Sequence, residues 1–361
     1  MNFTCFLLIV FSGFYLIDAP ISPVYITFII SIFGVVVGRY IPKPKEIFQK
    51  SIIITLIVTM FIQMISHMGL SHSAINVVFS LLYGLVTFWV CSRTDKEVIL
   101  KCCDKLVSFS VVFLIIEAIW RFMHPVYSQA LVEGGIGYYQ YKSSSIIFED
   151  SNFVGLYSMT VFFLAIFLEK TTGKNYRKSR LLLFMITLGT FSKGAIATIV
   201  LYSIIFSNKL KKWQKYFILG TGGVLAVYKF YQQIMFDGSL WERNYVITKS
   251  LEYFGNSDVI HKLFGYGFGS VANLPFKGGH NIFAVLLIET GIIGTLFIVG
   301  SLLVIGKKYR DAFMLIIPFL IATNATYAHA NSYLYCLIAV LVSLNIKDNV
   351  AYCNKYIAIS E

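Results

Sequence analysis

Residues 236–281 read FDGSLWERNYVITKSLEYFGNSDVIHKLFGYGFGSVANLPFKGGHN and form the longest polar segment of an otherwise apolar chain. Hydrophobic residues make up 57% of the 361 positions and charged residues only 13%. Soluble domains carry about 25% charged residues. The recurring apolar runs therefore predict an all-α polytopic membrane protein, with residues 1–361 forming a single integral membrane domain. We expect the quoted segment to be an active-site loop on the outer face of the membrane.

The apolar runs predict about twelve transmembrane helices. Mean hydropathy over the whole chain is +0.73, which agrees with this class. The predicted helices cover residues 3–17, 24–38, 51–67, 73–92, 106–120, 153–169, 180–192, 194–207, 216–235, 281–305, 312–327 and 332–346.

The net charge of +12 follows the predicted topology rather than indicating a nucleic-acid partner. Most Lys and Arg residues fall in every second connection between helices or in the C-terminal tail. By the positive-inside rule, these connections and both termini lie in the cytoplasm. Residues 121–152 and 236–280 then become two long outer loops, which favours catalysis or recognition over passage of a solute. The basic connections are 39–50, 93–105, 170–180, 209–215 and 307–310.

Residues 181–206, LLLFMITLGTFSKGAIATIVLYSIIF, test this topology. Their length suits one helix, but both flanks are basic, so an even number of crossings is needed. We therefore predict a short hairpin that turns at residues 191–194. Non-helical backbone at membrane depth is tolerated beside protein or a wet cavity, so Lys193 would face an aqueous pocket. The alternative is one long helix whose Lys193 side chain reaches the interface.

Arg243 and His280 are the two candidates for chemistry in the second long loop. A guanidinium offers a planar fork of donors that suits phosphate or carboxylate oxygens. The alternative for Arg243 is contact with lipid headgroups at the interface. Histidine takes up a proton near neutral pH, so His280 is a candidate general base for a hydroxyl. The alternative for His280 is an ordinary surface histidine.

Polar residues of the first loop and of the helix after the second loop are further candidates. Asp150 and Asn152 precede a predicted helix, and helix capping is their alternative role. Arg121 follows Glu117 by four residues, so the two can form an ion pair on one helix face. Glu289 lies about 12 Å below the outer surface, where ionisable groups are usually functional or paired.

The glycine-rich run FGYGFGS, residues 264–270, resembles a dinucleotide-binding fingerprint only superficially, because no strand precedes it. We interpret Gly265, Gly267 and Gly269 as sites of tight turns that let the chain fold over a ligand. The six cysteines show no Cys-x-x-Cys spacing, and neither outer loop contains Asp-x-Asp. The sequence therefore predicts no metal site and no cofactor.

Four segments resemble, in order, motifs of the bacterial O-antigen polymerase and O-antigen ligase superfamily. FEDSNFVG is similar to an aromatic-x-Asp-Pro-Asn-x-x-Gly motif, with Ser151 in place of proline. GTFSKGA looks like a Ser-Arg-Gly turn, with Lys193 in place of arginine. Arg243 followed by LFGYGFGS resembles the stretch that opens and crosses the large periplasmic loop. GHNIFAVLLIETGIIGTLF resembles the His-Asn helix start that follows that loop. The segments other than Arg243 lie at residues 148–155, 189–195, 263–270 and 279–297.

The resemblance implies a metal-independent inverting glycosyltransferase that needs no cofactor, in the bacterial inner membrane with its active site facing the periplasm. Undecaprenyl-diphosphate-linked oligosaccharides would be both donor and acceptor, in contact with membrane lipid, and a chain-length regulator is a further implied partner. His280 would deprotonate the acceptor hydroxyl, and Arg243, helped by Arg121 or Lys193, would stabilise the leaving diphosphate. The other residues expected to bind substrate are Asp150, Asn152, Asn281 and Glu289.

Within this superfamily we favour the polymerase, which joins repeat units on the lipid carrier. The chain is compact, and its heavy use of Ile, Phe, Tyr and Lys suits an AT-rich surface-polysaccharide locus. The alternative inside the superfamily is the ligase, which moves finished glycan to lipid A–core. The alternative of another class is a lipid-linked glycan flippase. A transporter typically shows internal repeats and a charged central cavity. This sequence shows no repeat, and few of its ionisable residues lie at mid-membrane depth.

Overall fold

The computed structural model describes residues 2–17, 19–38, 46–66, 69, 71–127, 137–148, 150–206, 211–221, 238–276, 281–324 and 330–360. These residues are helical or lie in turns, and no strand occurs among them. The helices are α1 (Asn2–Val10), α2 (Pro23–Val37), α3 (Ile47–Ile65), α4 (His72–Arg93), α5 (Lys96–Met123), α7 (Ser151–Thr172), α8 (Arg177–Gly189), α9 (Lys193–Ile205), α11 (Gly238–Asn256), α12 (Val259–Phe264), α13 (Ile282–Lys308), α14 (Phe313–Ala322) and α15 (Ser332–Ser360). Short 3₁₀ helices are η1 (Gly137–Tyr141), η2 (Ser270–Asn273) and η3 (Arg310–Ala312).

Within the described residues, five helices are long and apolar enough to cross a membrane: α3, α4, α5, α7 and α13. Helices α2 and α9 are shorter and also apolar. For the described residues, an all-helical fold with five candidate membrane-spanning helices is therefore confirmed. The count of about twelve spans and the placement of both termini in the cytoplasm stay predictions.

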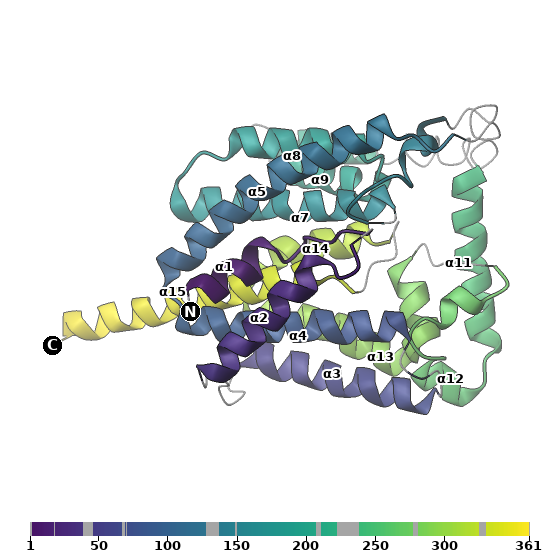
Figure 1. Cartoon of the computed structure of the whole chain (residues 1–361), viewed down its shortest axis with the longest axis horizontal. Helices are drawn as coiled ribbons and strands as arrows, with labels where there is room; N and C mark the ends of the chain where they lie inside the picture. Colours follow the sequence, from purple (N-terminus) through teal and green to yellow (C-terminus); the bar gives the residue numbers. More distant parts are fainter. Residues whose placement is uncertain are drawn as a thin grey trace.

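Helix α7 lies at the centre of the bundle. Of its most apolar 18-residue window, 89% is buried inside the protein, against 39% for α3 at the periphery. Helix α7 packs against α5, α8, α9 and α14, while α15 packs on α4 and α13 packs on α3 (Figure 1). Helix α7 therefore faces protein rather than lipid on nearly all sides. The surrounding helices hold the residues of its first turn in fixed positions.

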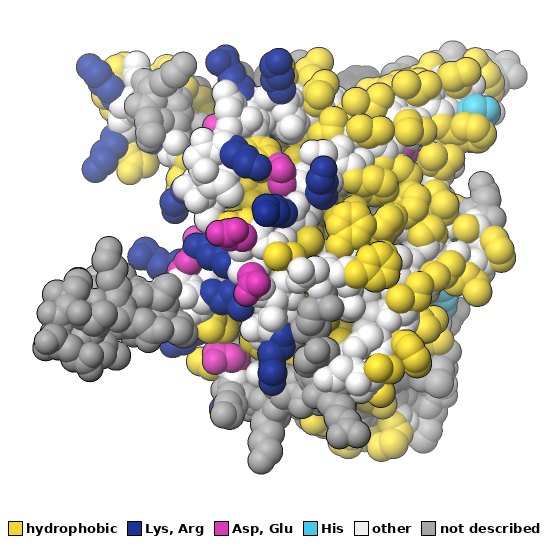
Figure 2. Space-filling view, turned by 60° about the vertical axis from the view of Figure 1, so that its left-hand side comes forward, with side chains coloured by type: hydrophobic (Ala, Val, Ile, Leu, Met, Phe, Trp, Pro, Cys, Tyr) yellow, Lys and Arg dark blue, Asp and Glu magenta, His cyan; other side chains and the backbone are white. Residues whose placement is uncertain are grey.

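The two ends of the bundle differ in charge. One end carries the ion pairs Lys96–Asp348, Lys174–Asp104 and Arg180–Glu169. Lys and Arg side chains gather there, whereas hydrophobic side chains cover much of the rest of the visible face (Figure 2). The opposite end carries the turn between α8 and α9, the segment before α7, and helices α11 and α12 (Figure 1). Among the described residues, these ion pairs and the turn between α8 and α9 therefore lie at different ends of the bundle, and the predicted orientation in the membrane stays a prediction.

The predicted hairpin at residues 180–207 is present as two helices, α8 and α9, separated by Thr190, Phe191 and Ser192. These helices pack against each other and against α7. The alternative of one long helix is therefore wrong for this chain.

The second long loop differs from the prediction, because much of it is helical. Val246 and Ser250 of α11 are each 2% exposed, and their spacing of four residues places them on one helix face. Further along, Tyr253 and Phe254 pack against a buried cluster that includes Val285 and Ile288 of α13. Helix α11 was not predicted, because many polar residues lie between its apolar positions and the helical spacing of the apolar residues was not recognised.

The largest differences from the predicted helix ends are in α5, α15 and α1. Helix α5 begins at Lys96 rather than residue 106, because charged residues extend an amphipathic helix beyond its apolar part. Helix α15 likewise continues to Ser360. Helix α1 ends at Val10 instead of residue 17. The chain passes so close to α7 after that point that a Cβ on Gly13 would lie 2.2 Å from the Tyr157 ring.

Candidate functional site

The turn between α8 and α9 is joined directly to the first turn of α7. Ser151 Oγ donates a hydrogen bond to the Thr190 carbonyl at 2.8 Å. Gly155 lies against the same turn, and a Cβ there would come within 2.5 Å of the Ser192 Cβ. Phe191 has φ 56°, a left-handed conformation that is uncommon for a bulky residue. Segments 148–155 and 189–195 therefore form one joint, with a strained backbone at its tip.

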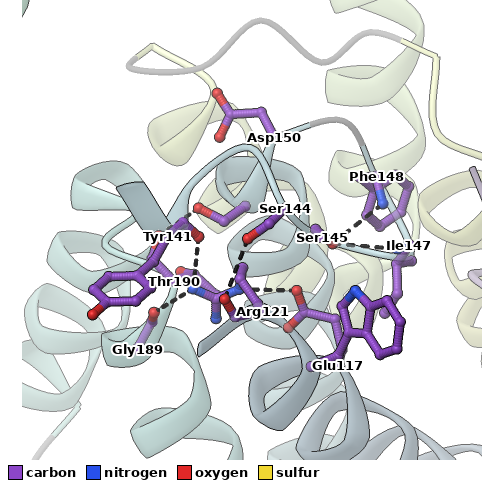
Figure 3. Close-up of polar contacts among 12 residues, drawn as sticks. Glu117, Arg121, Tyr141, Ser144, Ser145, Ile147, Phe148, Asp150, Gly189 and Thr190 are labelled. Atoms are coloured by element: carbon purple, nitrogen blue, oxygen red, sulfur yellow. Dashed lines mark hydrogen bonds and ion pairs between the residues drawn. The ribbon is translucent and has the colours of Figure 1, made fainter. Parts of the chain in front are cut away.

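Arg121 is buried beneath this joint (Figure 3). Its Nε donates to Glu117 Oε1 at 2.9 Å, and both side chains are 0% exposed. Its Nη1 donates to the carbonyl of Gly189 at 2.8 Å and to that of Tyr141 at 3.3 Å. The predicted ion pair with Glu117 is confirmed, and the guanidinium ties α5 to the end of α8 and to the 137–148 segment. A fully buried Arg121 holds the joint in place; its contact with a diphosphate stays a prediction.

Asp150 is the N-cap of α7, which confirms the capping alternative for this residue. Its carboxylate accepts the Asn152 backbone N–H at 2.7 Å and the Asn152 Nδ2 at 3.0 Å. Lys142 Nζ lies 3.4 Å from Asn152 Oδ1, and Lys142 is 7% exposed. Lys142 is not among the predicted site residues, because one lysine in a polar loop carries no local signal. The buried lysine places a positive charge beside the N-terminus of α7, where the helix dipole also favours anions.

The glycine-rich segment packs its backbone against α13. Gly291 has φ 63° and ψ −169° and breaks the helical path of α13, and Gly265 has φ 75°. A Cβ on Gly291 would lie 2.4 Å from the Leu263 carbonyl, and a Cβ on Gly265 would lie 2.4 Å from the Glu289 carbonyl. The Gly267 N–H donates to that same Glu289 carbonyl at 2.9 Å. Both glycines are needed here, because the two backbones approach each other too closely for a side chain and adopt positive φ.

Side chains of α3, of α13 and of the residue that caps α4 also bind the glycine-rich segment. Gln63 Oε1 accepts the Phe268 N–H at 2.9 Å, and Ser71 Oγ donates to the Phe268 carbonyl at 2.5 Å. The Glu289 carboxylate accepts the Gly269 N–H at 2.8 Å, and Glu289 is 1% exposed. Glu289 is therefore hydrogen-bonded to the glycine-rich segment, and its role in binding substrate stays a prediction. Gln63 and Ser71 are not among the predicted site residues, because their partner Phe268 lies about 200 residues away in the sequence.

Asn281 begins α13 and caps it. Its Oδ1 accepts the N–H groups of Phe283 and Ala284, at 2.9 and 3.1 Å. Its Nδ2 donates to the carbonyl of Asn324, after α14, at 3.3 Å. Asn281 therefore fixes where the chain re-enters the bundle, immediately after position 280. A role in binding substrate stays a prediction for it.

Lys193 is the first residue of α9 and is exposed at the tip of the hairpin. His280 lies outside the described residues, and so does the side chain of Arg243, although its backbone belongs to α11. The expected joint action of Lys193 and Arg243 on the diphosphate therefore involves a side chain outside the described part of the chain.

No protein-family model matches this sequence, and no curated protein matches it.

A second histidine of the same loop has a carboxylate partner. His261 Nδ1 is paired with Asp258, which also caps α12 through the N–H groups of Ile260 and His261. The His261 ring stacks on Tyr266 with ring centroids 4.0 Å apart. Hydrogen bonds from His261 lower the pKa of Asp258, which favours the ionised carboxylate. Because these partners are local and hold α12 against the glycine-rich segment, we interpret His261 as a structural residue.

Proposed function

We propose that this protein is a polysaccharide polymerase that joins undecaprenyl-diphosphate-linked repeat units on the periplasmic face of a bacterial inner membrane. One observation carries the proposal: the segments that resemble the O-antigen polymerase and ligase superfamily are paired with each other in space. Segment 148–155 is bonded to segment 189–195 through Ser151 and Thr190. Segment 263–270 is bonded to segment 279–297 through Gly267 and Glu289.

Both pairs lie at the same end of the bundle, away from the basic end (Figure 1). Short motifs that matched by chance would be scattered over the helices, with no reason to contact one another. Their pairing at one end supports a single site built from all of them. The basic opposite end supports an orientation with this site on the outer face, by the positive-inside rule.

The reaction that we propose is a single displacement at the anomeric carbon of the donor glycan. His280 removes the proton from an acceptor sugar hydroxyl, whose oxygen forms the new bond to that carbon. The bond from the same carbon to the diphosphate oxygen breaks, so undecaprenyl diphosphate leaves and the configuration inverts. The lipid diphosphate bond supplies the free energy, so no nucleotide is required.

Positive charge at this end supports stabilisation of the leaving diphosphate. Lys193 begins α9 and Lys142 lies beside the start of α7, so two lysines lie near two helix N-termini. Groups that are fixed before the reaction stabilise developing negative charge most effectively. We assign direct contact with the diphosphate to Lys193 and Arg243, and we assign to Arg121 the task of positioning the turn that carries Lys193.

Deletion of the gene tests the proposal through the surface glycan that remains. Single repeat units on lipid A–core are expected. Long glycan chains stranded on undecaprenyl diphosphate would instead indicate a ligase. Units trapped on the cytoplasmic side would indicate a flippase, and an unchanged glycan would contradict all three functions.

Complementation with His280→Ala tests the assignment of the base. Glycan polymerisation should be lost while the protein remains inserted in the membrane at wild-type amounts. His261→Ala is the matched control, because it removes another loop histidine that has structural partners. Full polymerisation by inserted His280→Ala protein would exclude His280 as the base.

A further inference from the structure

A groove runs between α9 and α14 toward the basic end of the bundle, and it is not part of the site described above. Its volume is about 1050 Å³. Apolar side chains form its walls and polar groups lie at one end. The walls include Leu201, Tyr202 and Ile205 of α9 and Met314, Ile317 and Ile321 of α14.

The rim of the groove is exposed on the outside of the protein. Leu201 is 37% exposed, Ile205 46%, Ile317 40% and Ile321 45%. An exposed apolar groove of this kind promotes aggregation in water, but it is expected on the lipid-facing surface of a membrane protein. Along α14 the lining extends from Phe313 to Ile321, about 12 Å at the helical rise. That length is close to half of a hydrocarbon core, about 15 Å, so the groove can hold an acyl chain of one leaflet.

The mouth of the groove is cationic. Lys170 and Arg310 line it, are exposed, and form no ion pair with another described residue. Lys215 Nζ donates to the carbonyl of Ile205, a residue of the groove wall, at 2.7 Å. Asp311 is the acidic group in the lining, and its carboxylate accepts a hydrogen bond from Asn345 at 3.5 Å. The two lining cations against one carboxylate leave a net positive charge at the mouth of the apolar groove.

We propose that this groove binds one anionic glycerophospholipid of the leaflet on the basic side. An acyl chain lies between α9 and α14, and the phosphate lies between Lys170 and Arg310. Arg310 offers a planar fork of donors to the phosphate oxygens, and Lys170 adds a point charge. A zwitterionic lipid fits the same apolar walls but carries its own cation, so charge at the mouth selects the anionic lipid. The site is independent of the proposed glycosyl transfer, which takes place at the other end of the bundle.

Native mass spectrometry of the purified full-length protein in detergent tests the proposal. Dioleoyl phosphatidylglycerol and dioleoyl phosphatidylcholine are titrated separately, so the two probes differ only in the headgroup. One phosphatidylglycerol should be retained at concentrations where phosphatidylcholine is not. Equal retention of the two lipids would overturn the proposal. Displacement of the lipid by millimolar inorganic phosphate would overturn it as well, because the acyl chain would then contribute nothing.

Variants localise the binding to the groove. The pair Lys170→Gln and Arg310→Gln should lower phosphatidylglycerol affinity about thirtyfold, since each cation near a lipid surface contributes about a factor of five. The matched control is Lys101→Gln with Lys105→Gln, which removes two exposed cations of α5 that do not line the groove. A comparable loss in the control pair would mean diffuse surface charge and would overturn the site.

Ile317→Trp tests the apolar part of the groove without changing any charge. Ile317 is 40% exposed, so the larger ring can extend into the groove without overpacking a buried core. Retention of phosphatidylglycerol should fall while the protein remains monodisperse. Unchanged retention would show that the acyl chain does not lie between α9 and α14.

Discussion

Removal of Glu117 should destabilise this protein more than removal of Glu117 and Arg121 together. Both side chains are 0% exposed, and their atoms Oε1 and Nε lie 2.9 Å apart. Glu117→Leu leaves the guanidinium buried without its counter-charge, which costs about 3–5 kcal/mol. In the double variant Glu117→Leu with Arg121→Met the charge is gone as well. Its main loss is the donor to the Gly189 carbonyl, and an unsatisfied buried acceptor costs about 1–3 kcal/mol. The double variant should therefore be about 2 kcal/mol more stable than Glu117→Leu.

The assay is the midpoint of chemical unfolding of the purified protein in detergent, followed by tryptophan fluorescence. Glu169→Leu is the matched control. It breaks the pair between Glu169 and Arg180, which has a separation of 2.8 Å but side chains 34% and 30% exposed. That partly exposed pair should contribute only about 0–1 kcal/mol. The reasoning fails if Glu169→Leu costs as much as Glu117→Leu, or if the effects of the two substitutions in the double variant simply add.

Two further predictions concern the second long loop. Gly291→Ala should lower both the unfolding midpoint and glycan polymerisation, because its Cβ would meet the Leu263 backbone at 2.4 Å and its φ is 63°. Gly300→Ala on the same helix is the control, has open space around it, and should be neutral or slightly stabilising. Asp258→Ala should speed hydrogen exchange of the α12 amides, whereas Asp258→Asn keeps a capping oxygen and should change it less. The pKa of Asp258 is lowered on folding, so its ionised form stabilises α12 at neutral pH. That contribution is lost only as the pH falls through the lowered pKa, and exchange in the wild-type protein should then approach that of Asp258→Ala at the same pH.

Features that depend on spacing or flanking charge could be predicted from the sequence. The basic flanks of residues 181–206 predicted two helices, and α8 and α9 are present. Two basic flanks belong on the same side of the membrane, which requires an even number of crossings between them. The spacing of four residues gave the pair of Glu117 and Arg121. The cap at Asp150 could be predicted from residue type, since an aspartate before a helix commonly accepts hydrogen bonds from the first free N–H groups of that helix.

Features that depend on distant contacts could not be predicted. Gln63 and Ser71 bind the backbone of Phe268, and nothing near either residue marks it as a partner of that segment. The left-handed conformation of Phe191 also escaped prediction, because a bulky residue adopts it only when the surrounding structure imposes it. Full burial of Arg121 was missed for a related reason, because its depth depends on how α5, α8 and the 137–148 segment pack together.

The contacts of the polar residues at the candidate site distinguish residues that hold the backbone from residues that are exposed to a substrate. Glu289, Asn281 and Asp150 all accept backbone N–H groups, so each of them closes a helix end or a turn. An acceptor used in this way is held by the backbone and is a poor general base, because a base must release and take up a proton at the substrate. Lys193 instead lies exposed at the tip of a hairpin whose position Arg121 fixes. Under the proposed function, Lys193, Arg243 and His280 are therefore the candidates for contact with substrate. Substitutions of Glu289, Asn281 and Asp150 are expected to act first on stability.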